Sequence, residues 1–462
     1  MNERIVIDAI SRRNFLLWAV GNSFRGCFRV VSGPDIFLHI SHDDLDGIGC
    51  TVMGKVAMIR NSTKETANNL KIRSWVNTGN INGILDVVTR EIDRCKSITP
   101  CTHIIANVLI TDIGSIDIGE LYERIKGSVS NIITQLNVVV IDHHQNLYFG
   151  NHASLPEGTI SHEHINGLGH TEFMAYYQQD NVSISYYVNT NVSATAIMEA
   201  FLIPTPTATP CTLRDNQHEF AVAVSMYDTG TFGNWLMPSV EDYDQLAPQA
   251  KLQYLREYAR TKNVSKSYDW LINLLAGHII DPDQTDEQAA FSDIELRHII
   301  AHMAKEATVG YEKFVSRMTP YMAVMFSGGL AGPVLPDGTR LYKKNEAQVQ
   351  LPRHPDLDPM TITVPAIATK VRPLNIAVIY SVTEEDAKFQ YSMYAKYYLE
   401  NNPGIDLMIH VRPNDYGGSD VGDYCAELRS AKDEVNCAII AHANGGGGHP
   451  RAAGFTIKRQ KR

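Results

Sequence analysis

Buried-strand patterns alternate with helical patterns in the first part of the chain. The apolar run at residues 36–40 predicts a strand, and apolar residues at helical spacing follow between residues 48 and 59. Similar runs predict strands at 107–111 and 138–141, with a helical pattern over 116–133 between them. This alternation is typical of an α/β fold, a parallel sheet with helices on both faces.

The pattern weakens further along. Residues of about 147–190 show little periodicity and several histidines, whose spacing matches no common zinc finger, so we expect an accessory surface insertion there. Ser193 or Thr195 is then expected to cap a short helix. A fourth strand-like run at 220–224 leads to Asp228.

Three regions are expected from the pattern as a whole. Residues 1–318 form the first domain, with helical spacing from about 245 to its end. Glycine and proline cluster in residues 319–368, which predicts short strands and turns that link two domains. A smaller α/β domain is expected over residues 369–462.

The last domain has its own alternation of elements. Strands are predicted at 374–380 and 406–411, with helices around 387–399 and 421–428. A glycine-rich segment, 445–454, precedes a final β-like run.

Composition narrows the classes of function. The 462 residues are 44% hydrophobic and 20% charged, which is ordinary for a globular protein. The net charge of −10 argues against a protein that coats a long nucleic-acid duplex. Seven scattered cysteines favour reduced thiols, and the absence of a long apolar run argues against a membrane segment or membrane partner. We therefore expect a cytoplasmic protein.

Residues of the types that commonly bind metals follow the predicted strands. They are His42, Asp44, Asp46, Asp112, Asp142, His143, His144 and Asp228. The carboxyl ends of parallel strands meet at one edge of a sheet, where open α/β sheets place their sites. If residues 42–46 stay extended, their side chains at every second position point the same way. Alone, this acidic stretch could also be a solvated turn or a calcium loop.

Four carboxylates in one cleft would repel one another. At ~5 Å and an effective dielectric of ~20, each pair costs roughly 3 kcal/mol before screening. Two divalent cations would offset this charge, and neutral imidazoles would complete their coordination. Mixed carboxylate and imidazole ligation suits Mn²⁺, with Mg²⁺ or Co²⁺ as alternatives.

The glycine-rich segment is a candidate ligand loop. Backbone N–H groups at Gly446, Gly447 and Gly448 would suit a phosphate, because no side chains obstruct them. His449 and Arg412 would add charge-assisted hydrogen bonds. The alternative is a flexible linker, although the segment His-Pro-Arg-Ala-Ala-Gly that follows is unlike one.

Together these motifs resemble the DHH phosphoesterase superfamily, which is named for a triplet like Asp142-His143-His144. The resemblance spans residues of about 36–228 and 373–457, where the later part is similar to the DHH-associated C-terminal substrate-binding domain. The first motif most resembles the oligoribonuclease (nano-RNase) branch.

The resemblance implies a role for each motif residue. One metal ion would be held by His42, Asp44 and Asp112, and the other by Asp46, Asp112, His143 and Asp228, so that Asp112 bridges the two. Asp112, His143 and His144 would be catalytic. His144 would face the substrate phosphate together with Arg412, Gly446, Gly447, Gly448 and His449, while Asp142 would orient its loop.

The implied activity is a Mn²⁺-dependent phosphodiesterase that releases nucleoside monophosphates from short oligoribonucleotides. A linear or cyclic dinucleotide phosphodiesterase uses the same residues, and a RecJ-type single-strand DNA exonuclease or an inorganic pyrophosphatase or exopolyphosphatase are further alternatives. An inactive nucleotide-binding module is the alternative outside enzymes. The expected partner is a short oligonucleotide or a dinucleotide, with no long duplex, and a homodimer stays open.

Overall fold

The chain forms two units, which are described separately. The computed structural model describes residues 9–28, 36–61, 72–78, 83–98, 103–114, 116–144, 155–165, 171–202, 212–228, 248–261, 271–277, 293–319, 322–324, 346–355, 357–370, 373–381, 391–413 and 423–458. The first unit comprises Met1–Asp228 and Leu252–Leu296, and the second comprises Thr229–Lys251 and Arg297–Arg462.

A seven-stranded sheet forms the centre of the first unit. In spatial order its strands are β2 (Ile72–Thr78), β1 (Ile36–His42), β3 (Ile104–Thr111), β4 (Ile133–Asp142), β7 (Val182–Asn189), β6 (Thr171–Gln179) and β5 (Ile160–Ile165). The strands from β2 to β7 run parallel to one another, whereas β6 and β5 pair antiparallel at one edge. Such a mixed sheet is common in α/β proteins with an antiparallel edge.

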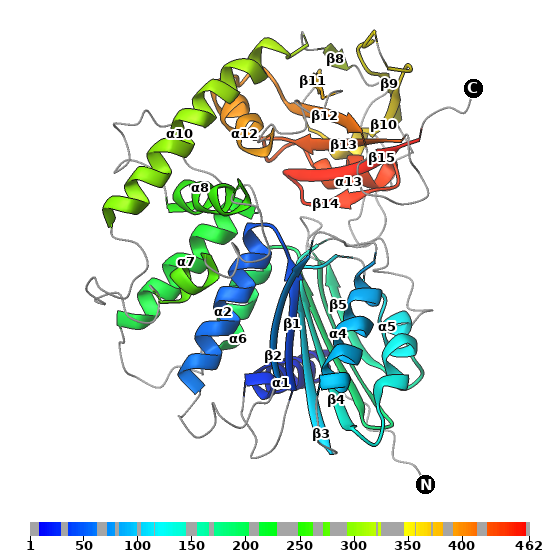
Figure 1. Cartoon of the computed structure of the whole chain (residues 1–462). Coiled ribbons are helices and arrows are strands. Elements are labelled where there is room, and N and C mark those ends of the chain that lie inside the picture. The colour runs from blue at the N-terminus through cyan, green and yellow to red at the C-terminus, as the bar shows by residue number, and fades with distance from the viewer. Residues whose placement is uncertain are drawn as a thin grey trace. The chain divides into compact units, whose positions relative to one another are not determined.

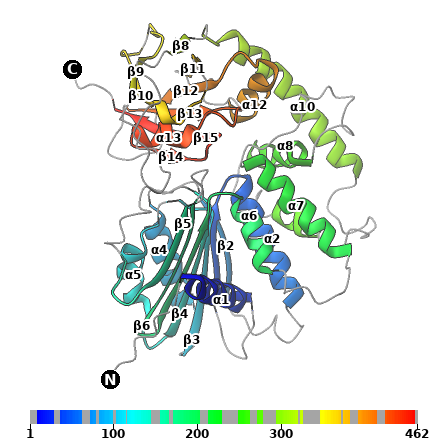
Figure 2. The same cartoon turned by 180° about the vertical axis from the view of Figure 1, so that it is seen from behind.

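Helices cover both faces of this sheet (Figures 1 and 2). The helices of this unit are α1 (Ala9–Phe28), α2 (Leu45–Asn61), α4 (Ile84–Ile98), α5 (Ile118–Ile125), the 3-10 turn η1 (Lys126–Ser128), α6 (Ala194–Leu202), α7 (Thr212–Asp228) and α8 (Pro248–Thr261). Helix α7 packs against α2 and α6. Apolar residues of α4 and α5 form one core cluster with alternate residues of the strands. Helices α1, α2 and α6 lie on the opposite face (Figures 1 and 2). The predicted parallel-sheet α/β fold is confirmed.

The predicted strand at 220–224 is wrong, because these residues lie within helix α7. Ala221, Ala223 and Val224 are buried, whereas Val222 between them is 39% exposed. Burial at such spacing fits one face of a helix better than the strict alternation of a half-buried strand. Asp228 is therefore the last residue of a helix rather than the end of a strand.

The expected surface insertion is also corrected where the structure describes it. Strands β5, β6 and β7 belong to the central sheet, and β7 lies between β4 and β6. Their aromatic side chains, such as the buried Tyr177 and Tyr186, pack in the core rather than at a surface. Residues 147–154 and 166–170 of the expected insertion lie outside the described residues. The predicted helix at 116–133 is shorter, because α5 ends at Ile125 and β4 begins at Ile133.

The second unit contains a six-stranded sheet and a separate two-stranded one. The larger sheet has the order β14 (Gly447–Gly448), β15 (Ala452–Ile457), β13 (Tyr424–Arg429), β12 (Leu407–Pro413), β11 (Leu374–Tyr380) and β8 (Met322–Val324), and the smaller one pairs β10 (Thr361–Pro365) with β9 (Glu346–Gln350). The accompanying helices are α10 (Asp293–Ser316), the 3-10 turn η4 (Ala366–Ala368), α12 (Tyr391–Asn401) and α13 (Cys437–Ala443). The strand predicted at 374–380 is confirmed.

Two sequence predictions for this unit need correction. Residues expected to link domains instead enter the core, since Val349, Ile362 and Val364 pack with the apolar residues of β11 and β12. The helix predicted around 421–428 is strand β13, whose residues alternate between buried and half-buried. That alternation has the period of a strand.

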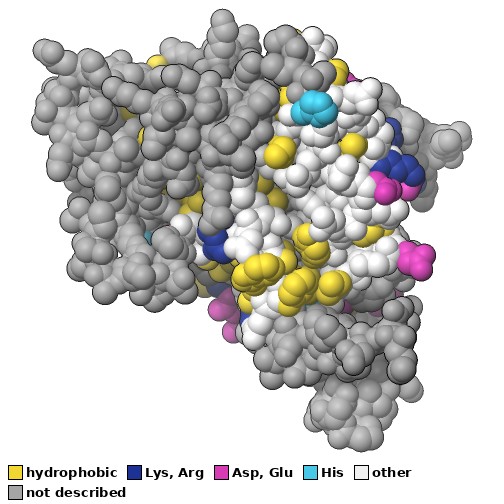
Figure 3. Space-filling view, turned by 90° about the horizontal axis from the view of Figure 1, so that it is seen from below, with side chains coloured by type: hydrophobic (Ala, Val, Ile, Leu, Met, Phe, Trp, Pro, Cys, Tyr) yellow, Lys and Arg dark blue, Asp and Glu magenta, His cyan; other side chains and the backbone are white. Residues whose placement is uncertain are grey.

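Two features bear on how the protein meets its surroundings, the hydropathy of its helices and the distribution of side chains on its surface. No helix among the described residues is long and apolar enough to cross a membrane. Figure 3 shows hydrophobic side chains on the face seen from below, with acidic and basic side chains interspersed among the described residues rather than gathered by sign.

Candidate metal centre

The first motif bends where β1 meets α2. His42 is the last residue of β1, and α2 begins at Leu45, so the predicted extended course of residues 42–46 is wrong. Asp44 lies at the N-cap of α2, where its Oδ1 accepts the Gly47 N–H at 3.0 Å. Asp46 lies in the first helical turn. The three side chains therefore do not point the same way. His42 and Asp44 belong to one cluster, and Asp46 belongs to a neighbouring one.

Gly47 is required by this bend for a steric reason. A Cβ at this position would overlap the backbone carbonyl oxygen of His42. The same carbonyl accepts a hydrogen bond from Asn77 Nδ2 at 2.9 Å. The backbone of the first motif is thus tightly fixed on this side.

His42, Asp44 and Asp112 form the first cluster. One possible ligand atom from each lies within 4.8 Å of the others. His42 Nδ1 is 2.8 Å from Asp44 Oδ2 and 4.0 Å from Asp112 Oδ2. Burial opposes a charge on His42, but the Asp44 carboxylate outweighs it and raises the pKa of His42. The three residues come from the end of β1 and the end of β3.

Asp46, His143 and Asp228 form the second cluster, again within 4.8 Å. His143 Nε2 lies 3.2 Å from Asp46 Oδ2, and His143 Nδ1 lies 3.4 Å from Asp228 Oδ2. The side chains of Asp46 and His143 are fully buried. His143 Nε2 also lies 2.9 Å from Asp112 Oδ1, so Asp112 reaches both clusters.

Helix α6 holds Asp46 from the opposite side. The backbone N–H groups of Ala194 and Thr195 donate to the two Asp46 carboxylate oxygens at 2.7 and 2.9 Å. Thr195 Oγ1 donates to the Asp46 carbonyl at 2.9 Å. The N-terminus of a helix favours a carboxylate because its N–H groups and dipole point toward it. Ser193 caps the helix as expected, since its Oγ accepts the Ala196 N–H at 3.3 Å.

Asp112 is under electrostatic and conformational strain. Its backbone φ is +57°, in the left-handed region that few non-glycine residues adopt. Burial, together with the carboxylates of Asp44 and Asp46, raises the pKa of Asp112 well above its usual value. Burial likewise raises the pKa of Asp228 to about 6. Such crowding of acids needs protons or cations, and the oxygen and nitrogen donors present fit divalent cations.

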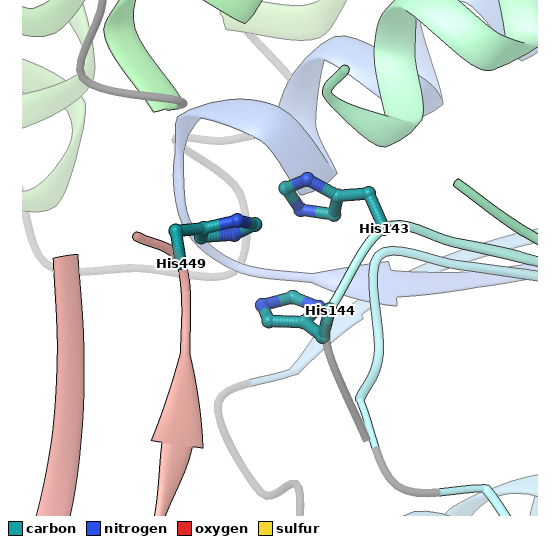
Figure 4. Close-up of side chains that lie close together, drawn as sticks. All are labelled: His143, His144 and His449. Carbon is teal, nitrogen blue, oxygen red and sulfur yellow. The ribbon is translucent and has the colours of Figure 1, made fainter. Parts of the chain in front are cut away.

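The triplet at the end of β4 is organised by its first residue, Asp142. Figure 4 shows its two histidines, His143 and His144. Asp142 Oδ1 accepts the His143 N–H at 2.8 Å and lies 2.8 Å from His144 Nδ1. Although burial opposes it, the Asp142 carboxylate raises the pKa of His144 to about 9. Asp142 therefore contacts both histidines that follow it. The centres of the His143 and His144 rings lie 4.5 Å apart at an edge-on angle.

The glycine segment of the second unit is explained by backbone packing. Gly447 and Gly448 form β14, which pairs with β15. A Cβ at Gly446 would overlap the carbonyl oxygen of Gly454, and Gly448 has a φ of +136°. Close approach of the strands therefore accounts for Gly446 and Gly448 without a bound phosphate.

The two other predicted substrate contacts have partners within the second unit. Arg412 Nε lies 2.8 Å from Glu427 Oε1 on the neighbouring strand. The His449 N–H donates to the Ala452 carbonyl at 2.6 Å, and His449 is 7% exposed. Burial would raise the pKa of Glu427, but a hydrogen bond from His410 and the nearby arginines outweigh it and lower that pKa.

Arg256 on α8 lies outside the sequence motifs, and no pattern in the sequence pointed to it. Its Nη2 donates to the carbonyl of Asp43, between two residues of the first cluster, at 3.1 Å. The two residues are 213 positions apart. Only the folded structure brings them together.

Comparison with protein-family models and with curated proteins found no match to this chain. Among solved structures, the chain is similar to a pGpG-specific phosphodiesterase, PggH from Vibrio cholerae, with a TM-score of 0.39 and 14% identity over 91% of this chain and 92% of that chain. A DHH domain described as a member of the s1p family of ribosomal proteins has a TM-score of 0.44 and 12% identity, over 98% of this chain and 89% of that chain. At these scores and identities, neither structure shows what this chain does.

Proposed function

We propose that this protein is a phosphodiesterase of the DHH type that depends on two divalent metal ions and releases nucleoside monophosphates from short oligoribonucleotides. One observation carries the proposal. Two clusters of carboxylate and imidazole donors lie side by side, and Asp112 reaches both of them. A carboxylate shared between two cations is the usual arrangement for hydrolysis of phosphoesters.

The donor set supports Mn²⁺ as the ion. His42, Asp44 and Asp112 would hold one ion, and Asp46, His143 and Asp228 the other, with Asp112 shared. Oxygen donors suit Mg²⁺ and Mn²⁺ equally, whereas the two imidazoles favour Mn²⁺ or Co²⁺ over Mg²⁺. When bound, such a pair of ions supplies charge stabilisation and an acidic water.

The protein's own residues position and hold the groups that take part. Two backbone N–H groups at the N-terminus of α6 hold the Asp46 side chain in place. Asp142 fixes one ring nitrogen of His144, so that the other can contact a phosphate oxygen of the substrate. Because Asp112, Asp142 and His143 are buried, their positions are set before the substrate arrives.

The substrate class rests on two further features. A net charge of −10 disfavours long, strongly charged duplexes. The Gly446–His449 segment with Arg412 resembles the substrate-binding part of DHH oligoribonucleases, so we propose that it binds a terminal nucleotide.

The test is hydrolysis of a defined panel with Mn²⁺. The panel contains labelled di- to pentaribonucleotides, linear and cyclic dinucleotides, long single-stranded DNA and pyrophosphate. We expect mononucleotide release from the short ribonucleotides, lost in Asp112→Ala and retained in the surface variant Asp86→Ala. No release by the wild type, or unchanged release by Asp112→Ala, would contradict the proposal. A preference for long single-stranded DNA would show that the substrate class is wrong.

A further inference from the structure

We infer that Arg256 of helix α8 is a positioning residue for the first metal cluster. This inference rests on the metal site of the proposed function and concerns a residue outside its motifs. Arg256 Nη2 donates to the backbone carbonyl of Asp43 at 3.1 Å. Asp43 stands between His42 and Asp44, so a contact at this carbonyl fixes the backbone from which both side chains extend.

The arginine is itself held by a short buried chain of hydrogen bonds. Arg256 Nη1 donates to Glu257 Oε1 at 2.9 Å, and Gln253 Nε2 donates to the same oxygen at 3.0 Å. Gln253 and Glu257 are only 4% and 5% exposed, and the Arg256 side chain is 15% exposed. Buried charges are costly unless paired, so this arrangement fixes the guanidinium rather than leaving it to solvent.

The second cluster is fixed by other groups. Asp46 receives its hydrogen bonds from α6, and His143 extends from β4. The two clusters therefore have separate supports, although Asp112 reaches both. Metal ligands tolerate displacements of only about 0.5 Å before affinity falls, so loss of the Asp43 contact should weaken one site and spare the other.

The experiment measures Mn²⁺ binding by calorimetry and by electron paramagnetic resonance, with no hydrolysis readout. Asp44→Asn first identifies which of the two binding steps belongs to the first cluster. In Arg256→Met we expect this step to weaken about tenfold, the order expected for a lost hydrogen bond to a charged donor. The other step should stay within about twofold, and Arg256→Lys should recover part of the loss.

A matched control and a double variant complete the design. Arg94→Met removes an arginine on α4 that pairs with Glu91, and we expect it to leave both steps unchanged. Adding Arg256→Met to Asp44→Asn should cause no further loss of affinity, because the affected site is already gone. Circular dichroism of the metal-free proteins checks folding, and if Arg256→Met does not fold, Arg256→Lys decides by the same criteria.

Unchanged affinities, or equal weakening of both steps, would overturn the positioning role. A wild type that binds no Mn²⁺ would overturn both this inference and the proposed function. If Arg256→Met weakens only the first step but the wild type hydrolyses no phosphodiester, the inference stands and the proposed function alone is removed.

Discussion

Asp112 Oδ1 and His143 Nε2 lie 2.9 Å apart with both side chains fully buried, at the ends of neighbouring parallel strands. The contact joins a strained backbone at Asp112 to a histidine that also faces Asp46 and Asp228. Strain and crowded acids of this kind persist where function requires them. We therefore expect changes at Asp112 to alter both the stability and the activity of the protein.

Replacing Asp112 should exchange activity for stability. In Asp112→Asn the buried carboxylate charge is removed, while asparagine tolerates the left-handed backbone. We expect the metal-free protein to gain about 1–2 kcal/mol in the free energy of unfolding, measured with denaturant in the presence of a chelator. Hydrolysis should fall at least about 10³-fold. A less stable and fully active variant would contradict both expectations, and Asp86→Asn on the surface of α4 serves as the control.

Gly49 should be intolerant of any side chain. A Cβ there would overlap Thr195 Oγ1 and approach Val224 Cγ1 to 3.2 Å, at the packing of α2 against α6 and α7. We expect Gly49→Ala to lower the free energy of unfolding by about 1–3 kcal/mol, because the core is overpacked. It should also weaken Mn²⁺ binding, since Thr195 holds Asp46.

Gly26 in α1 provides the matched comparison, because nothing lies within 4 Å of a Cβ at that position. Gly26→Ala should raise stability by about 0.5–1 kcal/mol through helix propensity. Equal effects of the two substitutions would show that helix propensity, rather than the contact with Thr195, decides the outcome at Gly49.

His39 should make stability depend on pH. Burial lowers the pKa of His39 to about 3, and its ring contacts the uncharged residues Thr111, Phe37 and Trp75. The unfolded chain takes up a proton near the ordinary value of 6.5, which the folded protein does not accept until about pH 3. Stability present above pH 6.5 is therefore lost as the pH falls toward 3. The loss amounts to a few kcal/mol at most, because each pH step of one within that interval contributes about 1.4 kcal/mol.

Denaturant unfolding of the metal-free protein between pH 7 and pH 4 measures this effect. His39→Gln should lose less stability over that range than the wild type, whereas His164→Gln, at an exposed position of β5, should follow the wild type. If the wild type and His39→Gln had the same slope, burial of a neutral His39 would not be the cause.

His449 should act on substrate binding rather than on the chemical step. If the glycine segment binds a terminal nucleotide, His449→Ala should raise KM about tenfold and change kcat less than about threefold. Steady-state kinetics on a labelled diribonucleotide separate the two constants. His442→Ala, in the last turn of α13, is the control. A fall in kcat at unchanged KM would place His449 in the chemical step instead.

Local patterns predicted the strands that carry the first cluster. The apolar run ending at His42 and the strand ending at Thr111 are both found. Parallel pairing of β1 with β3 then brings the residues that follow them together, as the topology of an α/β sheet requires.

The supports of the site could not be predicted in the same way. Asp46 is held by backbone groups 148 and 149 residues away, and the Asp43 carbonyl by Arg256, 213 residues away. Backbone N–H donors carry no residue signature. The strand predicted before Asp228 failed because a short apolar run has the same composition in a helix, and only its burial pattern distinguishes the two.

The most direct test of the proposed two-metal site is the anomalous scattering of a crystal soaked in Mn²⁺. We predict two peaks, one among His42, Asp44 and Asp112 and one among Asp46, His143 and Asp228, with a carboxylate oxygen of Asp112 within ligand distance of both. A map with no peak at these residues, or with a single peak that Asp112 does not contact, would contradict it.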